Sequence, residues 1–143
     1  MEPERPTIGA IIETSLYAQD LVAVRRFYAD VLGLEPFADV EGRHLFFRCG
    51  AGVLLIFNPQ ATRLAQGDVP AHGAEGPGHV AFAASAESLP AWRRRLEAAA
   101  CPIEAEVDWP GGGRSLYFRD PAGNSLELTT AATWNLPSSV EKP

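Results

Sequence analysis

The sequence has little positive charge. It contains 12 Lys and Arg residues against 18 Asp and Glu residues, which gives a formal net charge of −6 at pH 7. Nucleic-acid binding depends on clustered basic side chains that displace counterions from phosphates. The compact basic run at residues 93–95 lies within a helical pattern and is interpreted as a solvated helix face. We therefore expect no nucleic-acid partner.

Cysteine is also scarce. Only Cys49 and Cys101 occur, and neither belongs to a C-x-x-C pair. This pattern argues against a disulfide framework and gives no sign of a cysteine zinc site or a redox pair. Both residues are predicted to be reduced thiols packed near strand ends.

The sequence lacks long apolar runs and a secretory signal. No stretch approaches the roughly 18 to 20 consecutive apolar residues that a membrane span requires. Residues 1–7 carry two glutamates and two prolines in place of the basic and apolar segments that begin a secretory signal. These absences predict a soluble, cytoplasmic protein with no membrane partner.

Residues 8–58 have the pattern of a strand, a helix and three more strands. Residues 8–17 are rich in Ile, Thr and Tyr, which is typical of a strand, and Asp20 can cap the following helix. Gly33 can end this helix in a left-handed conformation. The helix has its apolar residues on one face: Leu21, Val24, Phe27, Tyr28 and Val31. Runs with strand character follow at 34–40, 43–49 and 52–58.

The second half repeats this order after a segment of different composition. Residues 59–77 are rich in Pro, Gly, Ala and His without a sustained period, which is typical of a connecting loop. A strand at 78–84, a helix marked by Leu89, Trp92, Leu96 and Ala99, and strands near 103–107, 115–119 and 125–130 follow. The sequence thus predicts a single domain over residues 1–143, with module one at about 8–58, a linker at 59–77, module two at 78–130 and a C-terminal tail at 131–143.

The repeated order indicates a duplicated βαβββ unit. The predicted fold class is α+β, with two tandem βαβββ modules that form a curved mixed sheet around a cleft and carry their helices outside. Side chains alternate across a pleated sheet, so every second residue of each strand is expected to line the concave face.

Three segments resemble the vicinal oxygen chelate superfamily, which includes glyoxalases, bleomycin-resistance proteins and extradiol dioxygenases. The segments are ETSLYAQDLVAVRRFYADVLGL (residues 13–34), GPGHVAF (76–82) and LYFRDPAGNSLEL (116–128). They occur in the superfamily's order, each at its expected place in a βαβββ repeat. The resemblance therefore covers nearly all of residues 8–130.

The resemblance implies metal ligands on the first and fourth strands of each module. Carried over residue by residue, these ligands are Glu13, His79 and Glu127. The remaining position falls on Leu54, which cannot bind a metal, so the implied site has three protein ligands. Glu13 is a second departure, because histidine or glutamine is more usual at that place. Each residue taken alone is an ordinary polar residue of a sheet, and only their joint spacing favours a metal site.

Imidazole and carboxylate ligands together suit a divalent first-row metal ion, here Ni, Zn, Mn, Fe or Co. The leading hypothesis is a glyoxalase-like lyase or isomerase that acts on a small substrate with vicinal oxygens. In this hypothesis Glu127 or Glu13 is the catalytic general base that removes a proton next to a carbonyl.

Five further residues are candidates for substrate binding. Alternation places His44, Phe46 and Arg48 on one face of a strand, but the sequence leaves open which face lines the cleft. On the inner face His44 could act as an acid or base, and Arg48 could hold a substrate carboxylate. Trp109 and Arg114 flank a glycine-rich turn, which is either a lid over the cleft or a wide hairpin loop.

Two alternative functions remain open. A ring-cleaving dioxygenase would use two histidines and a carboxylate on iron, whereas Glu13 stands in the place of the first histidine. A metal-free protein of the bleomycin-resistance type would use Glu13 and Glu127 as anionic contacts for a cationic ligand. Modules of this superfamily pair within one chain or across a two-fold interface, and we expect a homodimer that binds a small molecule.

Overall fold

The computed structural model describes residues 1–65 and 67–140. Residue 66 of the expected linker and residues 141–143 of the expected C-terminal tail lie outside the described residues. Within the described part, no helix is long and apolar enough to cross a membrane. Both cysteines are free, as expected, and Cys49 is the last residue of a strand.

The first half of the chain forms a four-stranded mixed sheet in the order β1-β4-β3-β2. Strands β1 and β4 are parallel, and the other neighbours are antiparallel. Helix α1 and a π-helical turn, η1, connect β1 to β2. The elements are β1 (Glu13–Tyr17), α1 (Leu21–Arg26), η1 (Phe27–Val31), β2 (Glu35–Val40), β3 (His44–Cys49) and β4 (Gly52–Phe57).

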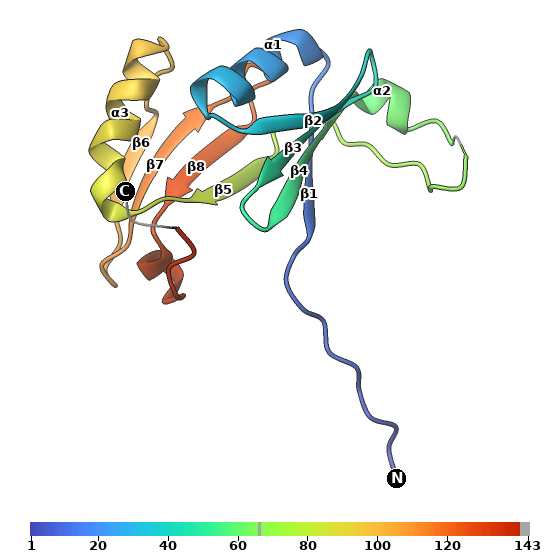
Figure 1. Cartoon of the computed structure of the whole chain (residues 1–143), viewed down its shortest axis with the longest axis horizontal. Helices are drawn as coiled ribbons and strands as arrows, with labels where there is room; N and C mark the ends of the chain where they lie inside the picture. The colour runs from blue at the N-terminus through green and yellow to red at the C-terminus, as the bar shows by residue number, and fades with distance from the viewer. Residues whose placement is uncertain (66, 141–143) are drawn as a thin grey trace.

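The second half forms another four-stranded sheet with the equivalent order, β5-β8-β7-β6. Strands β5 and β8 are parallel, and helix α3 lies outside this sheet (Figure 1). The elements are β5 (His79–Ala83), η2 (Ala86–Ser88), α3 (Leu89–Ala98), β6 (Ala105–Asp108), β7 (Arg114–Arg119) and β8 (Ser125–Thr129). The two equivalent sheets confirm the predicted α+β fold of tandem βαβββ modules.

Three local features of the structure differ from the elements that the sequence predicts. The first strand begins at Glu13, although Ile12 still accepts the backbone N–H of Val53, and residues 1–10 extend away from the body (Figure 1). The segment after β4 contains a short helix, α2 (Pro59–Thr62), whose first turn is capped by the Asn58 side chain. After β8 the chain forms a 3-10 helix, η3 (Ala131–Trp134).

Both modules contribute to one apolar core. The aromatic rings of η1 contact both sheets: the Tyr28 ring centroid lies 5.6 Å from that of Phe47 on β3, and the Phe27 centroid lies 6.4 Å from that of Phe118 on β7. All four residues belong to the same buried cluster. The first helical segment therefore packs between the modules and fixes the position of one sheet relative to the other.

A buried carboxylate joins the modules at one end of this core. Asp120, in the turn between β7 and β8, accepts hydrogen bonds from the Tyr28 hydroxyl at 2.7 Å and from the Asn124 side chain at 2.9 Å. Its other oxygen accepts the backbone N–H groups of Ala122 and Asn124. Asn124 also donates to the backbone oxygen of Tyr17 at the end of β1. Burial, followed by the charge of Asp120, raises the pKa of Tyr28 well above its usual range.

We expect Tyr28→Phe to lower the free energy of unfolding by about 1–3 kcal/mol, because it leaves one lone pair of a buried carboxylate without its donor. Urea unfolding of the two proteins measures this difference. The matched control is Tyr17→Phe, whose hydroxyl bonds to His72 at a partly buried position and should cost less. Equal effects of the two substitutions would contradict this account of the Asp120 turn.

Candidate metal centre

The second sheet has one face in the core and one open face. Register places His79 beside Ser125 on β8, and Tyr117 of β7 beside Glu127. The neighbouring residues Leu126 and Leu128 point the other way and are buried in the core. The period of two therefore places His79 and Glu127 together on the open face, opposite helix α3.

His79 and Glu127 form the centre of this face. The Nε2 atom of His79 lies 3.3 Å from Oε1 of Glu127. The Nδ1 atom of His79 lies 2.9 Å from the backbone oxygen of Ser125, which can only accept a hydrogen bond. Nδ1 must therefore carry a proton, and Nε2 either presents a lone pair to Glu127 or carries a second proton that it donates to Glu127. The histidine side chain is half exposed, whereas the Glu127 side chain is 8% exposed.

Two acceptor atoms that face each other need a cation or a second proton between them. Two ligand atoms held about 2.0–2.1 Å from one zinc-sized ion, at tetrahedral or right angles, lie about 2.8–3.4 Å apart. The observed separation of 3.3 Å falls in this interval. A neutral imidazole with a carboxylate is also a donor set that divalent first-row metals accept. The His79–Glu127 pair thus has the geometry of two ligands of one metal ion.

Ser115 completes the surroundings of Glu127, and the sequence analysis missed it. Its hydroxyl donates to Oε2 of Glu127 at 2.5 Å, and both residues are buried. Burial, and then the Glu127 carboxylate, raise the pKa of Tyr117 above its ordinary value. The alternation of Ser115 and Tyr117 along β7 was a signal, but assigning it to Glu127 requires the pairing of β7 with β8.

Glu13 is not brought to this pair within one chain. It begins β1 of the first sheet and is exposed, whereas His79 begins β5 of the second sheet. Among residues 1–65 and 67–140, no three His, Cys, Asp or Glu side chains gather closely enough to hold a metal ion. The structure therefore unites two of the three predicted ligands and leaves Glu13 on the other sheet.

The expected alignment of the fourth ligand position with Leu54 is wrong. Leu54 pairs with Thr14, so it points to the opposite side of the sheet from Glu13 and is buried in the core. Leu55 pairs with Ser15 and shares the face of Glu13. A one-residue change of register reverses the face, but both residues are apolar, and this position supplies no ligand in either case.

The open face of the first sheet carries His44, Phe46 and Arg48. Their strand partners on β4 are Phe57, Leu55 and Val53, which lie on the side of Glu13. The His44 ring stacks on Phe46 at 4.1 Å between centroids. Burial, followed by the neighbouring Arg43 guanidinium, lowers the pKa of His44.

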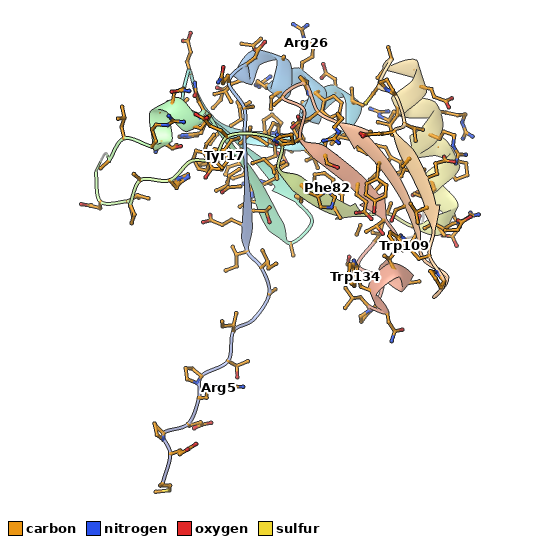
Figure 2. All side chains as sticks on the ribbon, turned by 180° about the vertical axis from the view of Figure 1, so that it is seen from behind. Arg5, Tyr17, Arg26, Phe82, Trp109 and Trp134 are labelled. Atoms are coloured by element: carbon orange, nitrogen blue, oxygen red, sulfur yellow. The ribbon has the colours of Figure 1, made fainter. Side chains whose placement is uncertain are left out.

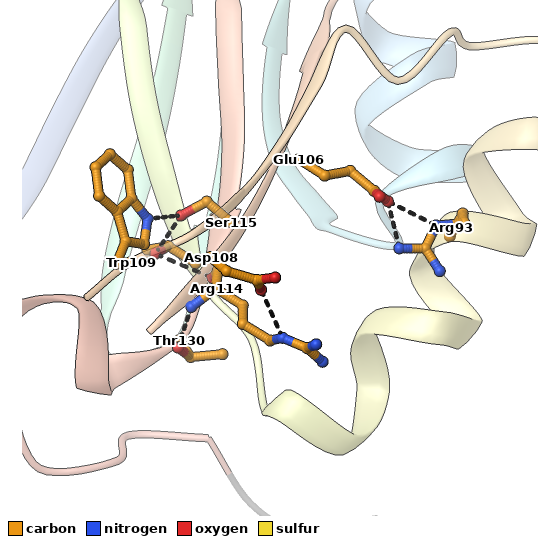
Figure 3. A network of polar contacts seen from close by, with 8 residues as sticks. Arg93, Glu106, Asp108, Trp109, Arg114, Ser115 and Thr130 are labelled. Carbon is orange, nitrogen blue, oxygen red and sulfur yellow. Dashed lines mark hydrogen bonds and ion pairs between the residues drawn. The ribbon is translucent and has the colours of Figure 1, made fainter. Parts of the chain in front are cut away.

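Trp109 and Arg114 lie at the β6–β7 hairpin and have different surroundings. The Trp109 indole donates to the Ser115 hydroxyl at 2.9 Å, which links it to the Glu127 side of the sheet (Figure 3). Arg114 pairs with Asp108 at 2.9 Å, and alternation places it on the face opposite Ser115. A backbone bond from Gly112 to Trp109 closes the turn.

Comparisons with known proteins agree on one family. The sequence profile of the Glyoxalase/Bleomycin resistance protein/Dioxygenase superfamily matches residues 10–128. The crystal structure of a lactoylglutathione lyase from Agrobacterium tumefaciens is similar, with 42% identity, a TM-score of 0.88, and coverage of 92% of this chain and all of that chain. A glyoxalase/bleomycin resistance protein/dioxygenase from Nocardioides has 25% identity and a TM-score of 0.70, over 88% of this chain and 85% of that chain.

A more distant structure shares the fold alone. The fosfomycin resistance protein of Listeria monocytogenes is 20% identical, with a TM-score of 0.66 over 87% of this chain and 94% of that chain. A search of curated proteins found no match.

Proposed function

The chain belongs to the Glyoxalase/Bleomycin resistance protein/Dioxygenase superfamily, and from this premise we propose that it is a metal-dependent lyase or isomerase. Its substrate would be a small molecule with two adjacent oxygens and a proton next to a carbonyl. The main support is the approach of His79 Nε2 to Glu127 Oε1 at 3.3 Å, with Nδ1 anchored on Ser125. The 42% identity to a lactoylglutathione lyase supports the reaction class.

In this proposal His79, Glu127 and Glu13 would hold Ni, Zn, Mn, Fe or Co, which would supply positive charge to polarise the two substrate oxygens. Glu127 removes the proton next to the carbonyl, and the electron pair of the broken C–H bond becomes negative charge on the substrate oxygens. The Glu127 carboxyl then returns the proton to the neighbouring carbon while the substrate's hydroxyl proton passes to the former carbonyl oxygen, so no oxidant or reductant is consumed. The open face of β3 supplies Phe46, His44 and Arg48 for substrate contact.

Glu13 would come from a second copy of the chain. The ligands lie on the open faces of different sheets, and β1 and β5 are each at one edge of their sheet. A two-fold dimer can place the first sheet of one copy against the second sheet of the other, which covers both edges and creates two equivalent sites. We therefore propose a homodimer in which each site combines Glu13 of one copy with His79 and Glu127 of its partner.

The proposed reaction can be tested by proton exchange. The protein is purified without chelator, analysed for metal, and incubated with lactoylglutathione in D2O. We expect NMR to show loss of the lactoyl C–H signal, because Glu127 removes that proton and solvent deuterium replaces it. Treatment with a chelator should stop the exchange, and addition of one of the five metals should restore it.

Two results would contradict the proposal. Exchange that continues unchanged after chelation would remove the metal from the reaction. A protein that contains no metal and takes up none of the five ions would instead support the metal-free, ligand-sequestering function.

A further inference from the structure

A chain of hydroxyl groups, buried at Ser115 and Thr129 and partly buried at Thr133, leads from Glu127 to helix η3. The Ser115 hydroxyl contacts Glu127 Oε2 at 2.5 Å and the Thr129 hydroxyl at 2.8 Å. The Thr129 hydroxyl contacts the Thr133 hydroxyl, also at 2.8 Å. Ser115, Thr129 and Glu127 are each at most 8% exposed, so these groups depend on one another for hydrogen bonds.

The hydrogen bonds at the Glu127 end of this chain have one direction each. An ionised carboxylate only accepts, and the Trp109 indole only donates, so Ser115 accepts from Trp109 and gives its one proton to Glu127. Thr129 can give its proton either to Ser115 at 2.8 Å or to the backbone oxygen of Arg114 at the longer distance of 3.5 Å, and the shorter contact favours Ser115. With that proton on Ser115, Thr133 donates to Thr129. In this arrangement the donors point toward Glu127, and such aligned chains strengthen each bond through polarisation.

The same chain connects Glu127 to two neighbouring elements, the β6–β7 hairpin turn and the 3-10 helix η3. Trp109 ends the β6 side of the hairpin, and Trp134 of η3 lies at the same end of the second sheet (Figure 2). Gly113 in the hairpin packs directly on Thr133, where a side chain at position 113 would collide with the Thr133 backbone. The hairpin and η3 thus pack against each other, and the hydroxyl chain connects both of them to the Glu127 carboxylate.

We infer that Ser115 and Thr129 are positioning residues: Ser115 occupies Oε2 of Glu127, Thr129 supports Ser115 through its hydroxyl, and Oε1 is left for the metal ion or, once displaced from it, for the substrate proton. This inference rests on the role of Glu127 in the proposed function. Without the donors, the carboxylate can rotate or bind an ion through both oxygens, and its alignment with His79 Nε2 is lost. Because the Trp109 indole N–H donates to Ser115, its environment should change when the Glu127 carboxylate changes.

The first test compares two changes at Thr129. Thr129→Val keeps the shape and removes the hydroxyl, whereas Thr129→Ser keeps the hydroxyl. Residues that orient metal ligands typically change metal affinity or activity by about 10–100-fold when replaced. We expect Thr129→Val and Ser115→Ala to weaken Zn²⁺ or Ni²⁺ binding by about this factor, and Thr129→Ser to recover most of the loss.

Thr130→Val is the matched control. Its hydroxyl accepts the backbone N–H of Arg114 and has no part in the chain (Figure 3). Metal binding should therefore change less in Thr130→Val than in Thr129→Val. If Thr129→Val binds metal as tightly as Thr130→Val does, the positioning role is overturned, while the metal site itself stands.

The second test needs neither metal nor substrate. The indole N–H signal of Trp109 is assigned in ¹⁵N-labelled, metal-free protein with the Trp109→Phe variant. We expect Glu127→Gln to shift this signal, because the new side chain changes the polarity of the Ser115 hydroxyl. The shift should disappear when Ser115→Ala is already present.

This second test separates the inference from the proposed function. A Trp109 response that requires Ser115 supports the chain even if no metal-dependent reaction is found. An indole signal that is the same with Glu127 and with Gln at this position would overturn the chain, even if the protein proves to be a metal-dependent lyase.

Discussion

Glu127→Gln is expected to lower turnover by about 10²- to 10⁴-fold, the range that a positioned general base contributes. An amide cannot take the substrate proton, but its oxygen can still contact a metal ion held by His79. The loss of turnover should therefore exceed the loss of metal content. Steady-state kinetics and metal analysis of the same preparations measure the two effects separately.

Glu106→Gln controls for the loss of one negative charge on the second module. Glu106 pairs with Arg93 of α3, away from the open face, so its replacement should leave turnover near the wild-type value (Figure 3). Turnover by Glu127→Gln equal to that of the wild type would remove Glu127 as the base.

Restoration of activity in a mixed dimer is the second large effect. Glu13→Ala and His79→Ala should each lose turnover when expressed alone, because every site lacks one ligand. Co-expressed with two different tags and purified through both, they form dimers in which one of the two sites has all three ligands. Such mixed dimers should show about half of the wild-type turnover, as a two-fold arrangement with sites shared between copies requires.

The control for the mixed dimer pairs His79→Ala with Glu127→Gln. Both changes lie on the second sheet, so neither site of this dimer is complete and no activity should return. Restoration in this control, or its failure in the first pair when both dimers form equally, would exclude a site shared between copies.

Periodicity and turn chemistry carried most of the fold prediction. The spacing of Val24, Phe27 and Tyr28 predicted the first helical segment, and these residues are buried as expected. The π-helical turn of η1 was not predictable, because its apolar spacing is also compatible with a continuous α-helix. The short helix α2 was missed because Asn58 and Pro59 begin it in a segment without a period.

The sequence predicted which residues belong to the candidate site but did not predict which of them lie close together. His79 and Glu127 could be named, but their proximity depends on the parallel pairing of β5 with β8. Likewise, the pairing of His44 with Phe57 was needed to show that His44 lies on the open face of the first sheet. Leu54 shows the limit most directly, since an alignment error of one residue moves a side chain from the open face to the core.

The core shared by the two modules makes each half of the chain dependent on the other. A polypeptide that ended at residue 77 would expose the aromatic rings of η1 and would leave the Tyr28 hydroxyl without Asp120 as its acceptor. A single βαβββ unit of this kind could cover that surface only by associating with another unit. In this architecture, duplication within one polypeptide replaces an association that separate half-length chains would have to make in solution.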